Sequence, residues 1–400
     1  MVRLLRRLRV LAQAVTLPFL LAACGSDGSN STGTGGGGSG GTGGTGGGQA
    51  LCAQPGAWTH TDVPDTTGVV STALALDPNG LPRVAYVSVN TLRYAAPADA
   101  SLSAWVDEKI ASSPAATKVS GLLQSTRPVL DGDTVHIVFD ENQITSPNGH
   151  PLTHALRVGG AWALEDLGQG SVWSEGLALA PNGELHLAYG NAGGLIYRSR
   201  IAGAWSAAEV VESSKVTGGT VGTGGFAALF LRAGVSDIYF TNANDTVRRA
   251  SGQPGTWTID ELFGDVDLAS SNETLAIAVD PTGNAHFLVP GGPREALWHV
   301  SNESGSWVTT ELYPERDPKK PVRFWAPSMV SDAQGGLHAI AQPDDCAGVL
   351  YLSRVGTEWK REVIDPDPRA GGAASIAVGA DGRPRVSYRA DGQLRIAVRD

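Results

Sequence analysis

Apolar residues along this chain recur with a period of about 50 residues. Seven tryptophans are each followed five residues later by a Val, Leu or Ile, and the intervals between successive tryptophans are 47, 57, 43, 52, 50 and 52 residues. The pairs are Trp58/Val63, Trp105/Ile110, Trp162/Leu167, Trp205/Val210, Trp257/Leu262, Trp307/Leu312 and Trp359/Ile364. A repeat of this length is typical of supersecondary units that stack and bury their faces against their neighbours.

A second pattern of apolar and polar positions lies between the tryptophans. Two alternating apolar runs are joined by an Asp-Pro-Asn-Gly turn or a variant of it, most clearly in 74–86, 177–189 and 376–388. The turn glycine suits a backbone with positive φ. A short third apolar run follows, and the tryptophan run comes after it. Each repeat therefore predicts four short antiparallel strands.

These repeats predict an all-β fold, a seven-bladed β-propeller with four antiparallel strands per blade. An odd spacing in a strand places Trp and its +5 aliphatic on opposite faces, so both faces need burial between two neighbouring sheets. The first tryptophan run, 57–63, has no preceding strands of its own, and the last three-strand set, 374–398, has no tryptophan run after it. We therefore expect the N-terminal strand to pair into the last blade and close the ring.

The N-terminus has the features of an export signal. Four arginines, Arg3, Arg6, Arg7 and Arg9, precede an uncharged stretch that is too short for a membrane span. It ends in Leu21-Ala-Ala-Cys24-Gly25, which resembles the lipobox of bacterial lipoproteins. That resemblance implies a lipoprotein signal peptide at 1–23, acylation of Cys24, and a membrane partner through the lipid anchor. Gly25 and Ser26 after the cysteine imply sorting to the outer membrane of a Gram-negative bacterium.

The segment after Cys24 is predicted to be a tether. Residues 25–48 contain fourteen glycines, with Ser and Thr filling most of the remainder, and such a composition does not bury apolar surface. We therefore divide the chain into the signal peptide, a tether at 24–53 and a propeller at 54–400. The formal charge of −10 becomes −14 without the four signal arginines, which argues against nucleic acid as a partner.

Two further cysteines, Cys52 and Cys346, are candidates for a disulfide in an exported protein. In a closed ring the regions around them become neighbours. The spacing alone leaves open whether they pair or remain free thiols.

Four histidines occupy one repeat position: His136, His186, His286 and His338. Equivalent positions on different blades lie far apart, and Arg83, Asp237 and Arg385 replace histidine in other copies. We therefore expect these side chains to pack or form hydrogen bonds at blade interfaces, and we predict no metal and no other cofactor.

Large side chains before the inner strands are the candidate ligand contacts. Trp173, Glu175, Glu273, Arg323 and Trp325 stand in connections that cross to the central face of a propeller, where most repeat-mates are small or polar. Exposed aromatics beside polar groups suit sugar stacking or a protein hot spot. The alternative is that the two rings plug the mouth of the channel.

The repeat resembles those of secreted bacterial propellers and, more distantly, sialidase-like and NHL-type propellers. The sialidase resemblance implies a carbohydrate-active enzyme, but the nearest match to its Asp-box, 301–307, has Glu in place of Asp and lacks one residue. That family also needs an arginine cluster, for which Arg127, Arg323 and Arg369 are candidates. The predicted function is a tethered module that binds a glycan or a protein without catalysis, and a glycoside hydrolase using the same face is the alternative.

Overall fold

The computed structural model describes residues 53–112, 123–141, 150–172, 175–191, 193–213, 226–241, 246–264, 275–291, 296–313, 324–344 and 347–400, without the side chains of 123–125, 141, 291 and 325–326. These residues belong to one compact unit, Gln49–Asp400. Every regular element within them is a β-strand. In this described part of the chain, no helix has the length and apolar character needed to cross a membrane.

The described strands form six hydrogen-bonded sheets. The largest has the order β1-β30-β29-β28-β2-β3-β4-β5. Its strands are β1 (Trp58–Asp62), β2 (Val69–Leu76), β3 (Pro82–Ser88), β4 (Thr91–Pro97), β5 (Trp105–Ser112), β28 (Ala370–Val378), β29 (Pro384–Ala390) and β30 (Gln393–Arg399). The two halves of this sheet meet at one parallel pair, Ser71 with Ala373. It therefore consists of two four-stranded units side by side.

The other five sheets follow one another along the chain. The second contains β6 (Leu123–Ser125), β7 (Val129–Asp131), β8 (Thr134–Glu141), β9 (His150–Val158) and β10 (Ala161–Gly170). The third contains β11 (Leu177–Leu179), β12 (Leu185–Asn191), β13 (Gly194–Ile201), β14 (Ala204–Trp205) and β15 (Glu209–Glu212). The fourth contains β16 (Ala227–Arg232), β17 (Val235–Thr241), β18 (Val247–Gly252) and β19 (Thr258–Phe263). The last two contain β20 (Ala276–Val279), β21 (Ala285–Gly291), β22 (Ala296–Ser301), β23 (Val308–Tyr313), and β24 (Phe324–Ser331), β25 (Leu337–Pro343), β26 (Leu350–Val355), β27 (Glu358–Val363).

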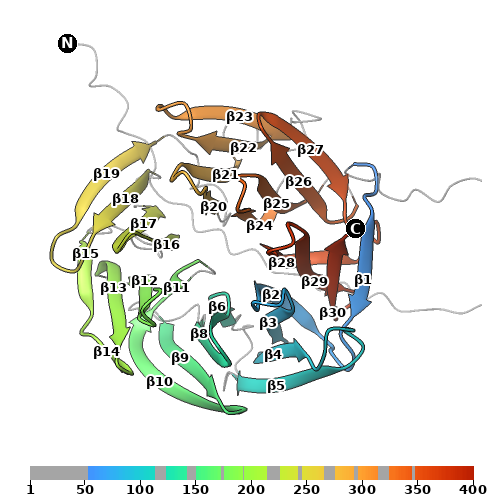
Figure 1. Ribbon diagram of the computed structural model, residues 1–400, viewed down its shortest axis with the longest axis horizontal. Helices are drawn as coiled ribbons and strands as arrows, with labels where there is room; N and C mark the ends of the chain where they lie inside the picture. Colours follow the sequence, from blue (N-terminus) through green and yellow to red (C-terminus); the bar gives the residue numbers. More distant parts are fainter. Residues whose placement is uncertain are drawn as a thin grey trace, which may run out of the picture. The chain divides into compact units, whose positions relative to one another are not determined.

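The architecture is an all-β propeller. Figure 1 shows the sheets arranged around a centre, with strands such as β2, β16, β20 and β28 innermost and β5, β10, β19 and β27 outermost. Each four-stranded unit is called a blade below and is named by its strands, for example the β20–β23 blade. The first and last parts of the described chain meet in one blade, where β1 pairs antiparallel with β30.

The hydrophobic core consists of clusters between neighbouring blades. Among the described residues there are seven such clusters, and each draws its members from two adjacent blades. Trp162 packs with the β2–β5 blade on one side, and Leu167 packs with the β11–β15 blade on the other. This confirms that the tryptophan and its +5 aliphatic bury opposite faces of a blade.

The β11–β15 blade departs from the expected spacing. Its outer strand is split into β14 and β15, and the pairing of β15 with β13 shifts register near the start of β13, between Leu195 and Ile196. Val210, the +5 residue from Trp205, is 53% exposed, whereas Val211 is buried and joins the cluster with the next blade. The extra residue in the split strand moves the buried position from +5 to +6, so the Trp205/Val210 pair was assigned wrongly.

The turns between the first and second strands of a blade have the predicted geometry. Gly283 and Gly335 have φ of 96° and 84°, a region that disfavours residues with a Cβ. An aspartate three residues earlier closes each turn. The Oδ1 of Asp280 accepts a hydrogen bond from the Asn284 N–H at 2.8 Å, and Asp332 accepts one from the Gly336 N–H at 2.7 Å. These carboxylates fix the loop that joins two core strands.

Candidate functional site

The inner strand of the β6–β10 blade is interrupted, and the interruption carries an arginine. β6 and β7 both pair with β8, and Thr126, Arg127 and Pro128 lie between them. Thr126 is fully buried; its N–H donates to Val138 O at 2.8 Å, and its Oγ1 accepts from the Val138 N–H at 2.9 Å. These two bonds hold the backbone immediately before Arg127.

The Arg127 side chain joins three distant parts of the chain. Its Nη2 lies 3.1 Å from Glu175 Oε1 and donates to Ser328 Oγ at 2.7 Å. The Arg127 and Glu175 side chains are 18% and 12% exposed. The buried Nε of Arg127 has no hydrogen-bond partner among the described residues. We call Arg127, Glu175 and Ser328 the inner polar cluster.

The backbone fixes the other two members of the inner polar cluster. Glu175 lies in the turn before β11, where its carbonyl accepts from the Leu229 N–H of the next blade at 2.8 Å. Ser328 follows a register shift in β24 and is 5% exposed. Its Oγ also accepts from the Ile376 N–H at 3.4 Å, which links the β24–β27 blade to β28. The cluster is therefore held by inner strands rather than by a free loop.

The predicted ligand contacts are only partly placed. Glu175 lies in the inner polar cluster, and Trp325 is in β24, three residues before Ser328. Trp173, Glu273 and Arg323 lie outside the described residues, as do Cys24, Cys52 and Cys346. Arg369, a candidate for an arginine cluster, is 62% exposed and pairs with Asp367 and Asp391. Its partners assign it to a surface network.

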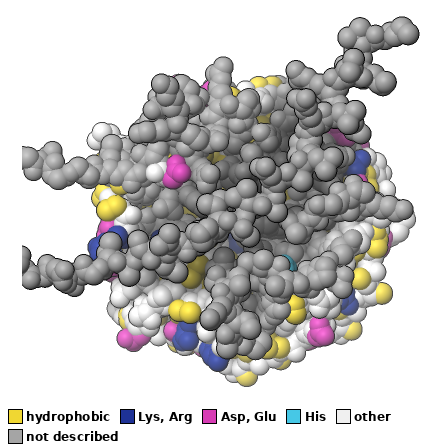
Figure 2. All heavy atoms as spheres, turned by 180° about the vertical axis from the view of Figure 1, so that it is seen from behind, with side chains coloured by type: hydrophobic (Ala, Val, Ile, Leu, Met, Phe, Trp, Pro, Cys, Tyr) yellow, Lys and Arg dark blue, Asp and Glu magenta, His cyan; other side chains and the backbone are white. Residues whose placement is uncertain are grey.

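Figure 2 shows acidic, basic and apolar side chains interspersed around the periphery of the face opposite to that of Figure 1.

The repeat-position histidines bond within their own blades. His186 and His338 approach the hydroxyls of Tyr197 and Tyr351, at 2.5 and 2.6 Å between Nδ1 and Oη. His338 Nε2 also lies 3.1 Å from Oδ2 of the turn residue Asp332. The predicted hydrogen-bonding role is confirmed, but the partners lie in the neighbouring strand and turn of the same blade instead of across a blade interface.

The other two repeat-position histidines form imidazole pairs. The Nδ1 of His136 lies 3.1 Å from His154 Nε2, and the Nδ1 of His286 lies 3.1 Å from His299 Nε2. Both pairs are stacked, with an interplanar angle of 8°. Burial, followed by the charge of the neighbouring imidazole, lowers the pKa of His136 to about 4 and that of His299 to about 3. Both rings are neutral at neutral pH.

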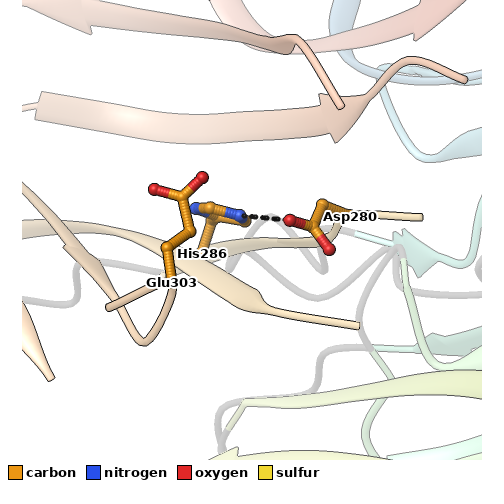
Figure 3. A group of neighbouring side chains, drawn as sticks. All are labelled: Asp280, His286 and Glu303. Carbon is orange, nitrogen blue, oxygen red and sulfur yellow. Dashed lines mark hydrogen bonds and ion pairs between the residues drawn. The ribbon is translucent and has the colours of Figure 1, made fainter. Parts of the chain in front are cut away.

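Figure 3 shows a third group, in which Asp280, His286 and Glu303 gather beside the turn of the β20–β23 blade. One potential ligand atom from each lies within 4.8 Å of the others. His286 is fully buried and Asp280 is 8% exposed. Burial acts to raise the pKa of Asp280, but hydrogen bonds from Asn284, Thr282 and His286 outweigh it and lower the pKa to about 2. Two carboxylates and one imidazole therefore lie together, each carboxylate also accepting a hydrogen bond from a neighbouring side chain.

The sequence reasoning missed a set of carboxylates between the blades. A glutamate on the outer strand of one blade accepts a hydrogen bond from the indole N–H of the next blade's tryptophan. The pairs, at 2.7, 3.1, 2.8 and 2.9 Å, are Trp162–Glu108, Trp205–Glu165, Trp257–Glu209 and Trp58–Glu362. Arg157 and Arg200, each five residues before a tryptophan, bind the same carboxylates as that tryptophan. An acid three or four residues after each tryptophan was the signal in the sequence.

Comparisons with known proteins support the fold. No protein-family model matches the chain, and no curated protein matches it. The polysaccharide lyase Uly1 has a TM-score of 0.53 at 9% identity, over 86% of this chain and 99% of its own. A catalytically inactive virginiamycin B lyase from Staphylococcus aureus, with quinupristin, has a TM-score of 0.52 at 11% identity, over 85% and 98%.

A fungal lectin is also similar in structure. The six-bladed β-propeller lectin of Aleuria aurantia has a TM-score of 0.47 at 17% identity, over 76% of this chain and 97% of its own. At identities this low the likeness concerns the fold alone. The arrangement of the blades in the structure itself identifies the β-propeller.

Proposed function

We propose that this protein is a glycan-binding module whose ligand contacts the inner polar cluster. One observation carries the proposal: Arg127, Glu175 and Ser328 come from three blades and meet within hydrogen-bonding distance at the inner strands. Together they offer guanidinium donors, a carboxylate acceptor and a hydroxyl. Sugar hydroxyls both donate and accept, so such a mixed set suits a glycan.

Aromatic rings complete the proposed site. Trp173 is two residues before Glu175 in the sequence, and Trp325 is three residues before Ser328. We propose that both rings stack on the ligand while the polar groups orient it, which is the usual division of roles at aromatic hot spots. In this proposal the protein has no catalytic step, and a glycoside hydrolase on the same face is the competing outcome.

A glycan array followed by calorimetry on the best ligand tests this function. Trp173→Ala and Trp325→Ala should each weaken affinity by about 1–3 kcal/mol, the range of aromatic hot spots, with little change in the melting temperature. Glu175→Gln keeps the shape of the side chain but removes the charge that faces Arg127, so it should weaken binding as well. Glu358→Gln, on the outer strand β27, is the matched control.

Three results would overturn the site or the function. If both tryptophan variants lose stability but keep their affinity, the rings plug the channel and do not bind. If no glycan on the array binds the wild-type chain, the glycan assignment fails. Turnover of generic glycosidase substrates that Glu175→Gln abolishes would establish the enzyme instead.

We also propose that the blades close into a seven-membered ring. The support is that the seven core clusters join each blade to the next, including the cluster of Val63, Val69 and Leu394 between β1/β28–β30 and the β2–β5 blade. Trp58, in β1, is 8% exposed and packs against Tyr351. Truncation of such a buried aromatic costs about 3–5 kcal/mol, so a Trp58→Ala variant with an unchanged melting temperature would argue against closure.

The module is proposed to be a lipoprotein. The support is the Leu21-Ala-Ala-Cys24 sequence and the glycine-rich segment after it, which would act as the tether between an outer-membrane anchor and the propeller. Cys24→Ser should release the protein from the membrane fraction, and unchanged fractionation would rule out acylation at this residue.

A further inference from the structure

We propose that Asp280, His286 and Glu303 form a binding site for a divalent transition-metal ion such as Zn²⁺. Imidazole together with carboxylate oxygens is a donor set that zinc uses in proteins, with three protein ligands and a water in open sites. The site is dry on the Asp280 and His286 side, whereas the Glu303 side chain is 36% exposed. A water molecule can therefore reach the fourth position from the Glu303 side.

The separation of the two buried donor atoms supports an ion between them. His286 Nε2 and Asp280 Oδ2 are 3.5 Å apart. Two atoms about 2.0–2.1 Å from one ion and related by a tetrahedral angle lie about 3.3–3.4 Å apart. In the β24–β27 blade the same turn places His338 Nε2 at 3.1 Å from Asp332 Oδ2, an ordinary hydrogen-bond length. The longer of these two histidine–aspartate distances occurs in the β20–β23 blade, which also has Glu303 as a third possible ligand.

Glu303 is the feature that distinguishes this blade. It stands four residues before the repeat tryptophan Trp307. The three other blades with a repeat-position histidine carry an exposed aliphatic residue at that place: Val158, Ile201 and Val355, at 56%, 51% and 76% exposure. Two blades have an aspartate beside the repeat-position histidine, and only one of these two, the β20–β23 blade, has a carboxylate at this place; the other has Val355.

An ion pair offers a competing explanation for Glu303. Arg354 Nη2 binds Glu303 Oε2 at 2.6 Å across the blade interface. Related arginines bind an outer-strand glutamate, but the β20–β23 blade has Thr310 at the corresponding place. The contact of Arg354 is with Oε2, so among the described residues this ion pair leaves Oε1 of Glu303 for a metal. Under the ion-pair explanation alone, the chain would have no specific affinity for zinc at this site.

His299 would support the metal from behind. A metal ligand histidine usually donates its other ring N–H to a partner, which orients the ring. His286 Nδ1 has such a partner in His299 Nε2 at 3.1 Å. Binding of a metal at His286 Nε2 therefore requires the proton of this ring to lie on Nδ1. That requirement provides a readout that is independent of any activity.

Zinc titration of the chelator-stripped protein tests the site directly. Zinc content after dialysis and calorimetric affinity would be measured for the wild type and for Glu303→Gln, whose amide oxygen can still accept from Arg354. We expect the variant to bind zinc at this site at least tenfold more weakly. Glu311→Gln, an exposed carboxylate in β23, is the matched control and should leave the affinity unchanged.

Nitrogen NMR of the imidazoles separates this site from adventitious zinc on cysteines or surface histidines. Zinc should shift the His286 Nε2 resonance and move its proton to Nδ1, and it should leave His338 unchanged. Equal affinity in Glu303→Gln and the wild type would overturn the proposal. So would saturating zinc that leaves the His286 resonances where they were.

Discussion

The two imidazole pairs, in the β6–β10 and β20–β23 blades, have the same geometry, but the acid that contacts each pair lies at opposite ends of the two pairs. Each pair joins the second strand to the third at 3.1 Å, with the rings stacked. In the β6–β10 blade the acid lies at the outer end, where Glu165 Oε2 is 2.8 Å from His154 Nδ1. In the β20–β23 blade it lies at the other end, where Asp280 meets His286 Nε2.

The position of the acid sets the direction of the hydrogen bonds in each pair. A carboxylate accepts only, so the ring nitrogen beside it carries the proton. His154 then carries its proton on Nδ1 and accepts from the His136 Nδ1–H. In the other blade His286 carries its proton on Nε2 and accepts from the His299 Nε2–H. One repeat position therefore supports two opposite proton arrangements.

The difference also explains why only one pair is suited to a metal. Asp280, in the turn, places Oδ2 beside Nε2 of His286, and the carboxylate of Glu303 lies close to both. In the β6–β10 blade the residue six positions before His136 is Leu130, and the acid is occupied by Arg200 and Trp205 between the blades. Glu165 therefore acts as an interface residue, whereas Asp280 is a turn residue beside a second carboxylate, Glu303, whose Oε2 binds Arg354.

Among the changes that test this contrast between the two blades, Glu165→Ala has the largest expected effect. This change leaves His154, Arg200 and Trp205 without their shared acceptor. Burial acts to raise the pKa of Glu165, but the bonds from Arg200 and His154 lower it to about 2, so the lost group is a carboxylate anion. We expect a loss of about 2–4 kcal/mol in the free energy of unfolding. This loss is smaller than that for a fully buried ion pair, because the Glu165 side chain is 33% exposed.

Urea denaturation measures this loss, and Thr310→Ala provides the control. Thr310 faces His299 in the register where Glu165 faces His154, and it is exposed. Its truncation should change the unfolding free energy by no more than about 0.5 kcal/mol. Equal losses in the two variants would mean that the acids do not distinguish the two blades.

Most of the fold could be predicted from the sequence because the same short-range patterns recur in each blade. The tryptophan and its +5 aliphatic, the turn glycines and the alternating strands each specify part of a blade. The exception, Val210, arises from one extra residue in a split strand, and such a shift is invisible to a fixed spacing. Burial follows from periodicity only while the strand stays regular.

The candidate sites were harder to predict from the sequence, because the residues that form them are far apart along the chain. Arg127 was noted only as an arginine before an inner strand, and its bond to Ser328 spans 201 positions. Glu175 was predicted from its place before β11, but its pairing with Arg127 was not. The shared repeat position of the histidines does not reveal their neighbours within a blade, and those of His286 are Asp280 and Glu303.

A smaller effect is expected in the pH dependence of stability through His136. Its folded pKa of about 4 lies below the unfolded value of 6.5, through burial and then the charges of His154 and Arg200, partly opposed by Glu165. The unfolded chain therefore binds the proton more tightly. The stabilisation from neutral His136 is complete above pH 6.5 and is lost as the pH falls toward 4.

His136→Asn isolates this contribution, because its amide nitrogen takes the place of Nδ1 and can still donate to His154. We expect the unfolding free energy of the wild type to fall between pH 7.5 and 5.0 by about 2 kcal/mol more than that of the variant. Parallel curves for the two proteins would show that His136 titrates alike in the folded and unfolded chains.

The smallest expected effect concerns only the position of protons in the metal-free protein. Nitrogen NMR should find His136 and His154 protonated on Nδ1, and His286 and His299 protonated on Nε2.

Asp280→Asn should invert the second pair. Asn284 donates its backbone N–H to Oδ1 and its side-chain Nδ2 to Oδ2 of Asp280. We expect the amide oxygen of the variant to keep the backbone donor and the Asn284 side chain to turn its own oxygen toward the new NH₂, which then faces His286 Nε2. His286 would then carry its proton on Nδ1, as His136 does. Asp332→Asn changes the related turn of the β24–β27 blade and should leave both pairs as they are. The same tautomers in both wild-type pairs would show that the acids do not set the direction, and the contrast between the two blades would then be one of position alone.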